Sequence, residues 1–137
     1  MGAENLAYAL TQVVHNFGAA AVFGGAVFAL WPASRLVGAG RQFAWLILLA
    51  WGAQIASGVL FGVTSFYYYG EMPDLSSVAM TALVVKVAAA VSGFLLAAVY
   101  LARGREWGHA SVKRTFQGLA ALAILALTAA AFLRWFS

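Results

Sequence analysis

The sequence has no cysteine and little charge. Without cysteine, the 137-residue chain cannot use disulfides, iron–sulfur ligation, thiolate zinc sites or a cysteine nucleophile. Charged residues make up 9% of the chain, against about 25% in an average soluble domain, and 64% of the residues are hydrophobic. A soluble protein of this length could not bury so much apolar surface, and a disordered chain would be far more polar. We therefore predict an integral membrane protein with a single domain over residues 1–137.

The few charges divide the chain into four long apolar segments. Glu4 and Arg35 enclose thirty uncharged residues, and Arg41 and Glu71 enclose twenty-nine. Of the two later segments, one contains a single charge, Lys86, and the other contains none. A membrane-spanning helix needs about 20 apolar residues, and its backbone groups must be bonded within the segment. We predict four such helices, near 6–31, 42–66, 76–102 and 113–135.

The connections between these segments are short, so consecutive helices should be antiparallel neighbours. The fold class expected is all-α, an integral membrane four-helix bundle. The first and third connections contain the bases Arg35, Arg41, Arg103, Arg105, Lys113 and Arg114. The second contains Glu71 and Asp74 and no base. By the positive-inside rule, we expect both termini outside the cytoplasm of a bacterial inner membrane, and the net charge of +4 reflects this orientation rather than a nucleic-acid partner.

Polar side chains within the predicted spans indicate where a site lies, because they usually face the bundle interior. His15 and Lys86 each lie about ten residues from the outer end of their helix, or roughly 15 Å deep. Gln54, on the second helix, reaches a similar level. Gln12 and Gly18 lie one turn from His15. Small residues such as Gly18 beside a histidine leave room for a flat ligand such as haem, although they also allow close helix packing. Three polar side chains at one depth predict a single internal site.

Lys86 has no acidic partner within any predicted span. Its stem covers roughly 6 Å and cannot carry the amine across about 15 Å to water. We therefore expect Lys86 to pair with an anion, such as a ligand carboxylate, or to be uncharged. His109 lies on the order of 20 Å from the level of His15, so the two histidines are not expected to share an iron. Met80 and Lys86 itself are the other candidate axial donors.

Three short motifs lie between residues 8 and 105. They are the His15-Asn-Phe-Gly-Ala-Ala-Ala-Val-Phe-Gly-Gly25 stretch, the Ser57-Gly58-Val-Leu segment and Val85-Lys86-Val. They resemble the superfamily that joins copper resistance D-type membrane proteins with HemJ-type protoporphyrinogen oxidases. The resemblance implies that His15 and Lys86 take part in binding haem b, and that the chain is a HemJ-like oxidoreductase.

We expect a haem b protein in which His15 ligates the iron and Lys86 holds a haem propionate or another acidic group. Gln54 would add a polar contact, with Gln12 and Gly18 beside it. The role would be electron transfer, or redox chemistry on a lipophilic substrate such as a quinone or porphyrinogen. A copper transport or resistance protein and a cofactor-free structural membrane subunit are the alternatives. The partners expected are the lipid bilayer and a lipophilic redox partner, and the sequence allows a homo-oligomer.

Overall fold

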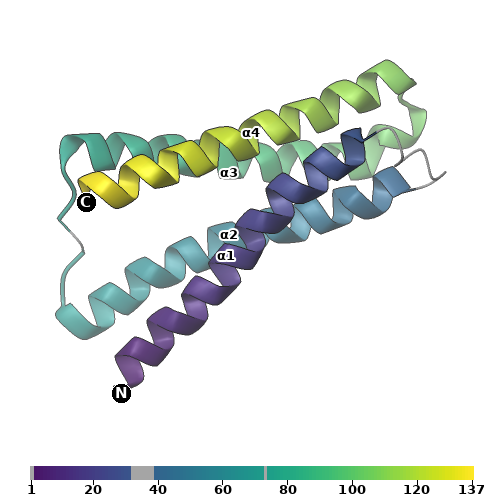
Figure 1. Ribbon diagram of the computed structural model, residues 1–137. Coiled ribbons are helices and arrows are strands. Elements are labelled where there is room, and N and C mark those ends of the chain that lie inside the picture. The colour runs from purple at the N-terminus through teal and green to yellow at the C-terminus, as the bar shows by residue number, and fades with distance from the viewer. Residues whose placement is uncertain (1, 32–38, 73) are drawn as a thin grey trace.

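The computed structural model describes residues 2–31, 39–72 and 74–137, and over these ranges it contains helices and no strand. The elements are α1 (Ala3–Leu30), α2 (Ala39–Tyr69), α3 (Ser77–Arg103), the short 3-10 helix η2 (Gly104–Glu106) and α4 (His109–Phe136) (Figure 1). All four α-helices are long and apolar enough to cross a membrane. The prediction of an all-α bundle of four candidate spanning helices is confirmed.

Most helices are longer than the predicted apolar segments. With 27 to 31 residues each, the α-helices are about 40–46 Å long, whereas the hydrocarbon core of a bilayer is about 30 Å thick. The helix ends are set by local capping: the Ser76 hydroxyl accepts a hydrogen bond from the Ala79 N–H at 3.2 Å where α3 begins. Gly70, with φ +74°, ends α2 in the left-handed region that favours glycine. Hydropathy predicts the part of a helix in lipid rather than its ends.

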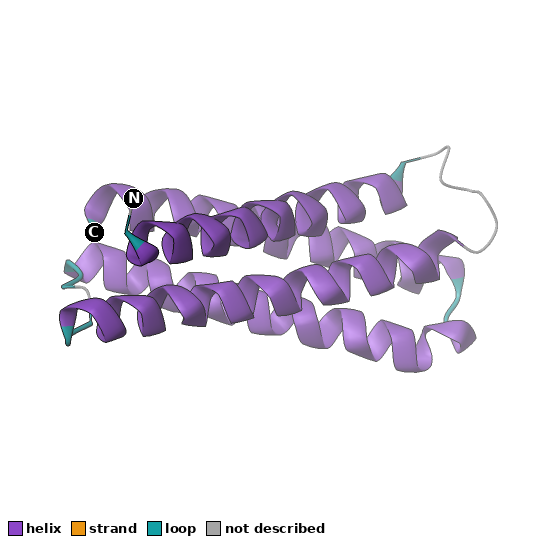
Figure 2. Cartoon of the chain, turned by 90° about the horizontal axis from the view of Figure 1, so that it is seen from below, coloured by secondary structure: helices purple, strands orange, loops and turns teal. Residues whose placement is uncertain are grey.

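The helices form two antiparallel hairpins, α1 with α2 and α3 with α4. Contacts of α2 with α3, and of α1 with α4, join the hairpins, so α1 and α3 lie diagonally across the bundle. Figure 2 shows both termini and the connection from α2 to α3 at one end of the molecule, and the connection through η2 at the other. In Figure 1 the hairpins lie close together at the η2 end and diverge toward the termini.

Polar contacts at the helix ends fit this divergence. At the end with the termini, the Tyr69 hydroxyl donates to Glu4 within the first hairpin. The Ser76 hydroxyl there donates to the Phe136 carbonyl within the second. At the η2 end, Arg41 Nη1 donates to the Leu101 carbonyl at 2.8 Å and so joins α2 to α3. Of these three bonds, only the one at the η2 end links the two hairpins.

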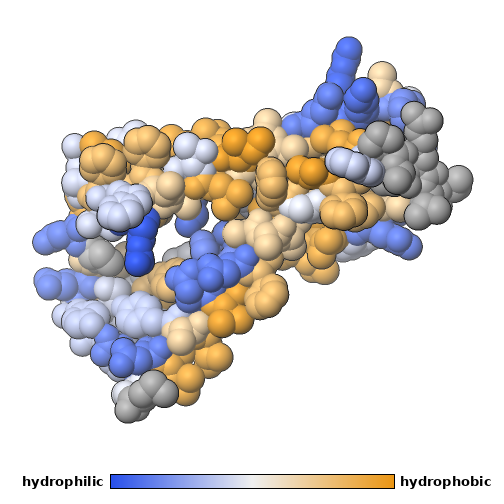
Figure 3. Space-filling model, in the orientation of Figure 1, coloured by the Kyte–Doolittle hydropathy of each residue, from blue (hydrophilic) through white to orange (hydrophobic). Residues whose placement is uncertain are grey.

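The core between the helices is rich in alanine, with a few large side chains. Trp51, Ile47 and Leu119 are the largest fully buried hydrophobic residues. Small residues let the helices approach closely, as in other membrane bundles: a Cβ on Gly25 would lie 3.1 Å from Ile47. The outward surface is also apolar, since Phe17 is 75% exposed and Leu49 is 66% exposed. Figure 3 shows hydrophobic residues over most of the middle of the molecule and hydrophilic ones toward its ends, the pattern expected of a protein in lipid.

Candidate functional site

His15 and Lys86 meet across the diagonal of the bundle. Lys86 Nζ on α3 lies 3.1 Å from His15 Nε2 on α1, and both side chains are half-buried. Because α1 and α3 pack on α2 and α4 rather than on each other, this contact lies between the two hairpins. The equal depths predicted from the sequence therefore correspond to a direct contact in the structure.

The other ring nitrogen of His15 contacts α2. His15 Nδ1 lies 2.7 Å from the hydroxyl oxygen of Ser57, which is fully buried. The Gln54 side-chain amide donates to the backbone carbonyl of His15. The Phe61 ring meets the imidazole edge-on, with 5.6 Å between centroids and 74° between planes. The histidine is thus held at its ring and at its backbone by two side chains that lie one turn apart on α2.

Gly18 provides space for Gln54 rather than for a ligand. A Cβ on Gly18 would lie 2.7 Å from Gln54 Nε2 and 3.3 Å from the Ala50 carbonyl oxygen. The missing side chain lets the Gln54 amide pass α1 and reach the carbonyl of His15. Gln12 lies outside this cluster: it is exposed, and its amide donates to Asn16 Oδ1 at 2.6 Å along the surface of α1.

The structure brings together three of the five predicted site residues, His15, Lys86 and Gln54, and adds two that the sequence analysis missed. These are Ser57 and Phe61. Ser57 follows Gln54 by three positions, a spacing that places both on one face of a helix and could have indicated a shared role. Phe61 is one further turn along and is one of ten phenylalanines, so nothing in the sequence distinguishes it.

Lys86 has a partner that the sequence analysis did not consider. The chain's four acids lie near the ends of the helices or in the connections, at Glu4, Glu71, Asp74 and Glu106. The lysine amine instead lies at hydrogen-bond distance, 3.1 Å, from the imidazole nitrogen Nε2. An imidazole contributes an acceptor without a full negative charge, so this part of the bundle has no anion to balance an ammonium group.

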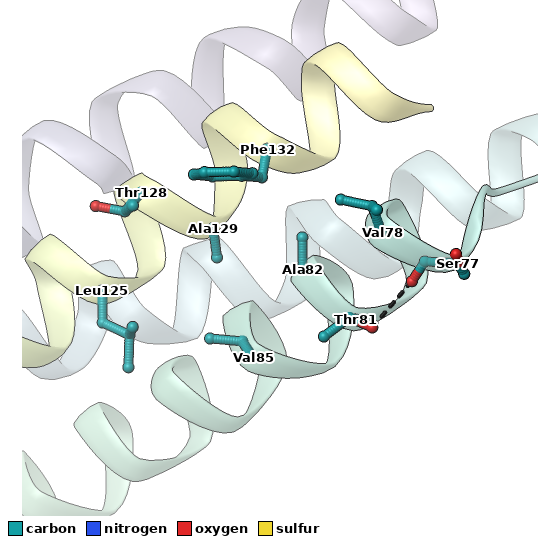
Figure 4. Close-up of a pocket in the computed structure, with 9 residues that line it drawn as sticks. All are labelled: Ser77, Val78, Thr81, Ala82, Val85, Leu125, Thr128, Ala129 and Phe132. Carbon is teal, nitrogen blue, oxygen red and sulfur yellow. Dashed lines mark hydrogen bonds between the residues drawn. The ribbon is translucent and has the colours of Figure 1, made fainter.

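The helices leave two spaces between them. In Figure 3 the surface is hollowed between the hairpins toward the termini, where hydrophilic residues border the opening. A separate groove of about 430 Å³ lies between α3 and α4 (Figure 4). It is lined by Ser77, Val78, Thr81, Ala82, Val85, Leu125, Thr128, Ala129 and Phe132. The groove is mostly apolar, and its Thr81 and Thr128 hydroxyls donate to carbonyls of their own helices, so it suits a hydrocarbon chain and does not include the polar cluster.

The donor set limits the metal chemistry available. Among the described residues, no group of three or more histidine, cysteine, aspartate or glutamate side chains could hold a metal ion. His109 is the exposed first residue of α4 at the η2 end, and Met80 is 49% exposed on α3. The 3.1 Å between His15 Nε2 and Lys86 Nζ is a hydrogen-bond distance. The polar cluster therefore offers a metal one imidazole nitrogen.

Comparisons with known protein families, with curated proteins and with solved structures found no match to this chain. The resemblance carried by the three short motifs therefore stays a prediction. The chain itself provides one histidine at membrane depth, bonded to a buried serine through one nitrogen and facing a lysine of the other hairpin through the second.

Proposed function

We propose that this chain is a haem b-binding protein of a bacterial inner membrane, acting in electron transfer or in redox chemistry on a lipophilic substrate such as a quinone or porphyrinogen. His15 would be the iron ligand through Nε2. The observation that supports this most is the hydrogen bond between its other nitrogen and Ser57, because metal-ligating histidines almost always bond their second ring nitrogen to an oxygen. When bound, the haem would supply the one-electron redox chemistry.

The donor set suits haem better than copper. A haem iron needs one protein imidazole because the porphyrin supplies four nitrogens, whereas copper handling favours several soft ligands close together. His15 provides one imidazole nitrogen at membrane depth, and no second histidine or cysteine lies beside it among the described residues. These features support a single-histidine haem site.

Lys86 would change partners when haem binds. Its amine now faces the same nitrogen that iron would use, so it must leave Nε2. A released ammonium at membrane depth needs a counter-charge, and the chain has no acid at that level. A haem propionate, or the carboxylate of an acidic substrate, would supply it. Lys86 would thus hold and orient an acidic group beside His15.

The proposed orientation places both termini outside the cytoplasm. The η2 end carries most of the bases, including Arg41, Arg103, Arg105, Lys113 and Arg114. The opposite end carries Glu4, Glu71 and Asp74, with Arg134 as its one base. This asymmetry supports a cytoplasmic η2 end by the positive-inside rule. The hollow between the hairpins would then face the outer half of the bilayer.

Haem retention in matched histidine variants tests the proposal. We expect His15→Ala to insert normally, because alanine suits a spanning helix, and to lose the Soret band after purification. His109→Ala, which removes the exposed histidine at the η2 end, should keep haem at the level of the parent. If His15→Ala retains haem at the parent's stoichiometry, His15 is not the ligand. If the parent itself contains copper and no haem, the copper alternative replaces the proposal, and if it contains neither, the chain is a structural subunit.

A further inference from the structure

We propose that Ser57 is a positioning residue, which fixes His15 as the neutral tautomer with its proton on Nδ1. Nε2 then carries the lone pair directed at Lys86. The serine does this from a fully buried position on α2, where no water competes for its hydroxyl. The tautomer follows from the hydrogen bonds of the cluster alone. Only its consequence for metal binding rests on the proposed haem function.

The hydroxyl proton of Ser57 is already used by its own helix. The Ser57 oxygen lies 2.6 Å from the Ala53 carbonyl oxygen and 3.3 Å from the Gln54 carbonyl oxygen. A carbonyl oxygen only accepts, so the single hydroxyl proton must point at one of these two. Helical serines commonly donate in this way to the carbonyl four residues earlier. Toward His15, Ser57 therefore offers lone pairs and no proton.

The proton of this contact must consequently come from the imidazole. If Nδ1 carried a lone pair, two lone pairs would face each other across 2.7 Å, with no hydrogen between them. With the proton on Nδ1, the His15 ring donates to Ser57, and Ser57 donates to Ala53 in turn. The result is a short chain of bonds that ends on the backbone of α2.

The contact at Nε2 agrees with this assignment. Lys86 Nζ lies 3.1 Å from Nε2, so its amine can donate to the lone pair that the Nδ1–H form leaves on that nitrogen. The opposite neutral tautomer thus fails at Nδ1, whereas the Nδ1–H form satisfies both ring nitrogens.

The positioning has a consequence for the proposed haem ligand. A hydrogen bond from the far nitrogen to an oxygen orients a ligating imidazole and raises its basicity. Ser57 would provide this bond before any ligand arrives, and Gln54 holds the backbone of the same residue. The nitrogen that must bind iron is therefore the one left with a free lone pair when Lys86 moves away.

Nitrogen NMR of the full chain, purified without haem in detergent, tests the tautomer directly. The chain has two histidines, so ¹⁵N-histidine labelling of the His109→Gln variant leaves one imidazole to observe. We expect one neutral ring, with a proton bonded to Nδ1 and none on Nε2. Ser57→Ala should lose this single-tautomer spectrum and populate the Nε2–H form, and Ser57→Thr, which keeps a hydroxyl, should restore it. Ser65→Ala, which removes another buried hydroxyl from α2 without contacting His15, should leave the spectrum unchanged.

The inference is wrong if His15 in the parent carries its proton on Nε2 or on both nitrogens, or if Ser57→Ala leaves the spectrum unchanged. A titration of the apo-proteins with haemin separates this inference from the proposed function. Loss of a hydrogen bond that orients a metal-ligating histidine commonly weakens metal binding ten- to a hundredfold. Without its bond to His15, the Ser57→Ala variant should therefore bind haemin ten- to a hundredfold more weakly than Ser65→Ala. If the parent binds no haemin, the proposed function fails while the NMR result stands. If haemin binds but the parent tautomer is Nε2–H, the positioning role alone fails.

Discussion

Replacing Gly93 by alanine tests how closely the two hairpins approach each other about two helical turns from Lys86, toward the η2 end of the bundle. Gly93 lies seven residues after Lys86, on the same face of α3. A Cβ on Gly93 would lie 2.4 Å from Cε2 and Nε1 of the Trp51 indole on α2. Carbon atoms in contact are normally about 3.5–4.0 Å apart, so the ring or a helix must move by about 1 Å. Trp51 is 1% exposed and packs in the core of the bundle, so we expect overpacking to cost about 1–3 kcal/mol.

Gly58→Ala is the matched control. Gly58 is also inside a helix, but outside the backbone of its own helix turn and its two chain neighbours no atom lies within 4 Å of the position its Cβ would take. Both substitutions gain a similar helix propensity, about 1 kcal/mol, so the difference between the two variants isolates the overpacking. We expect Gly93→Ala to be less stable than Gly58→Ala by about 1–3 kcal/mol in denaturant unfolding of the detergent-solubilised protein. Equal free energies of unfolding, within about 0.5 kcal/mol, would refute the close approach of Trp51 to Gly93.

Three further predictions concern the polar cluster and the topology. Gly18→Ala should destabilise the parent by about 1–3 kcal/mol, because the methyl group displaces the Gln54 amide from its hydrogen bond to the His15 carbonyl. The same substitution should cost much less in the Gln54→Ala background, and additive costs in this double-mutant cycle would contradict the contact. Lys86→Met removes a charge that costs about 2.5–3.5 kcal/mol in a membrane, and it also removes a hydrogen bond worth about 1.5–3 kcal/mol, so the stability of the apo-protein should change by less than about 2 kcal/mol. The affinity for haemin should fall about tenfold or more, and an unchanged affinity would remove Lys86 from the site. A reporter fused after Ser137 should be active only in its periplasmic form, and cytoplasmic activity would reverse the proposed orientation.

The fold could be predicted from the sequence because membrane helices follow one strong constraint. Backbone groups in lipid must be bonded within the segment, so the long apolar runs had to be helices, and short connections made them antiparallel. The helix ends could not be predicted from the same signal. α4 begins at His109, four residues before the predicted start, because a helix continues through the polar interface until a cap or turn ends it.

The candidate site was predicted in part. Depth can be counted along a helix, which is why His15 and Lys86 were expected at one level. The rotation of each helix about its axis cannot be counted in this way: Gln12 and Gly18 lie at equivalent spacings from His15, yet Gln12 faces outward and Gly18 lies against Gln54. Ser57 was not predicted as a site residue, because a serine bonded to its own helix is common in spanning segments. Its second role depends on which residue of α1 packs against it, and that is a property of the folded bundle.

The optical spectrum of the unmodified chain, purified from bacterial membranes in mild detergent, tests the central proposal most directly. A haem b protein with one histidine ligand per chain should show a Soret band at a stoichiometry of about one haem per chain, and the band should shift on reduction with dithionite. A chain that inserts, purifies and remains folded without a Soret band, and that takes up no haemin when it is added, would contradict the haem function.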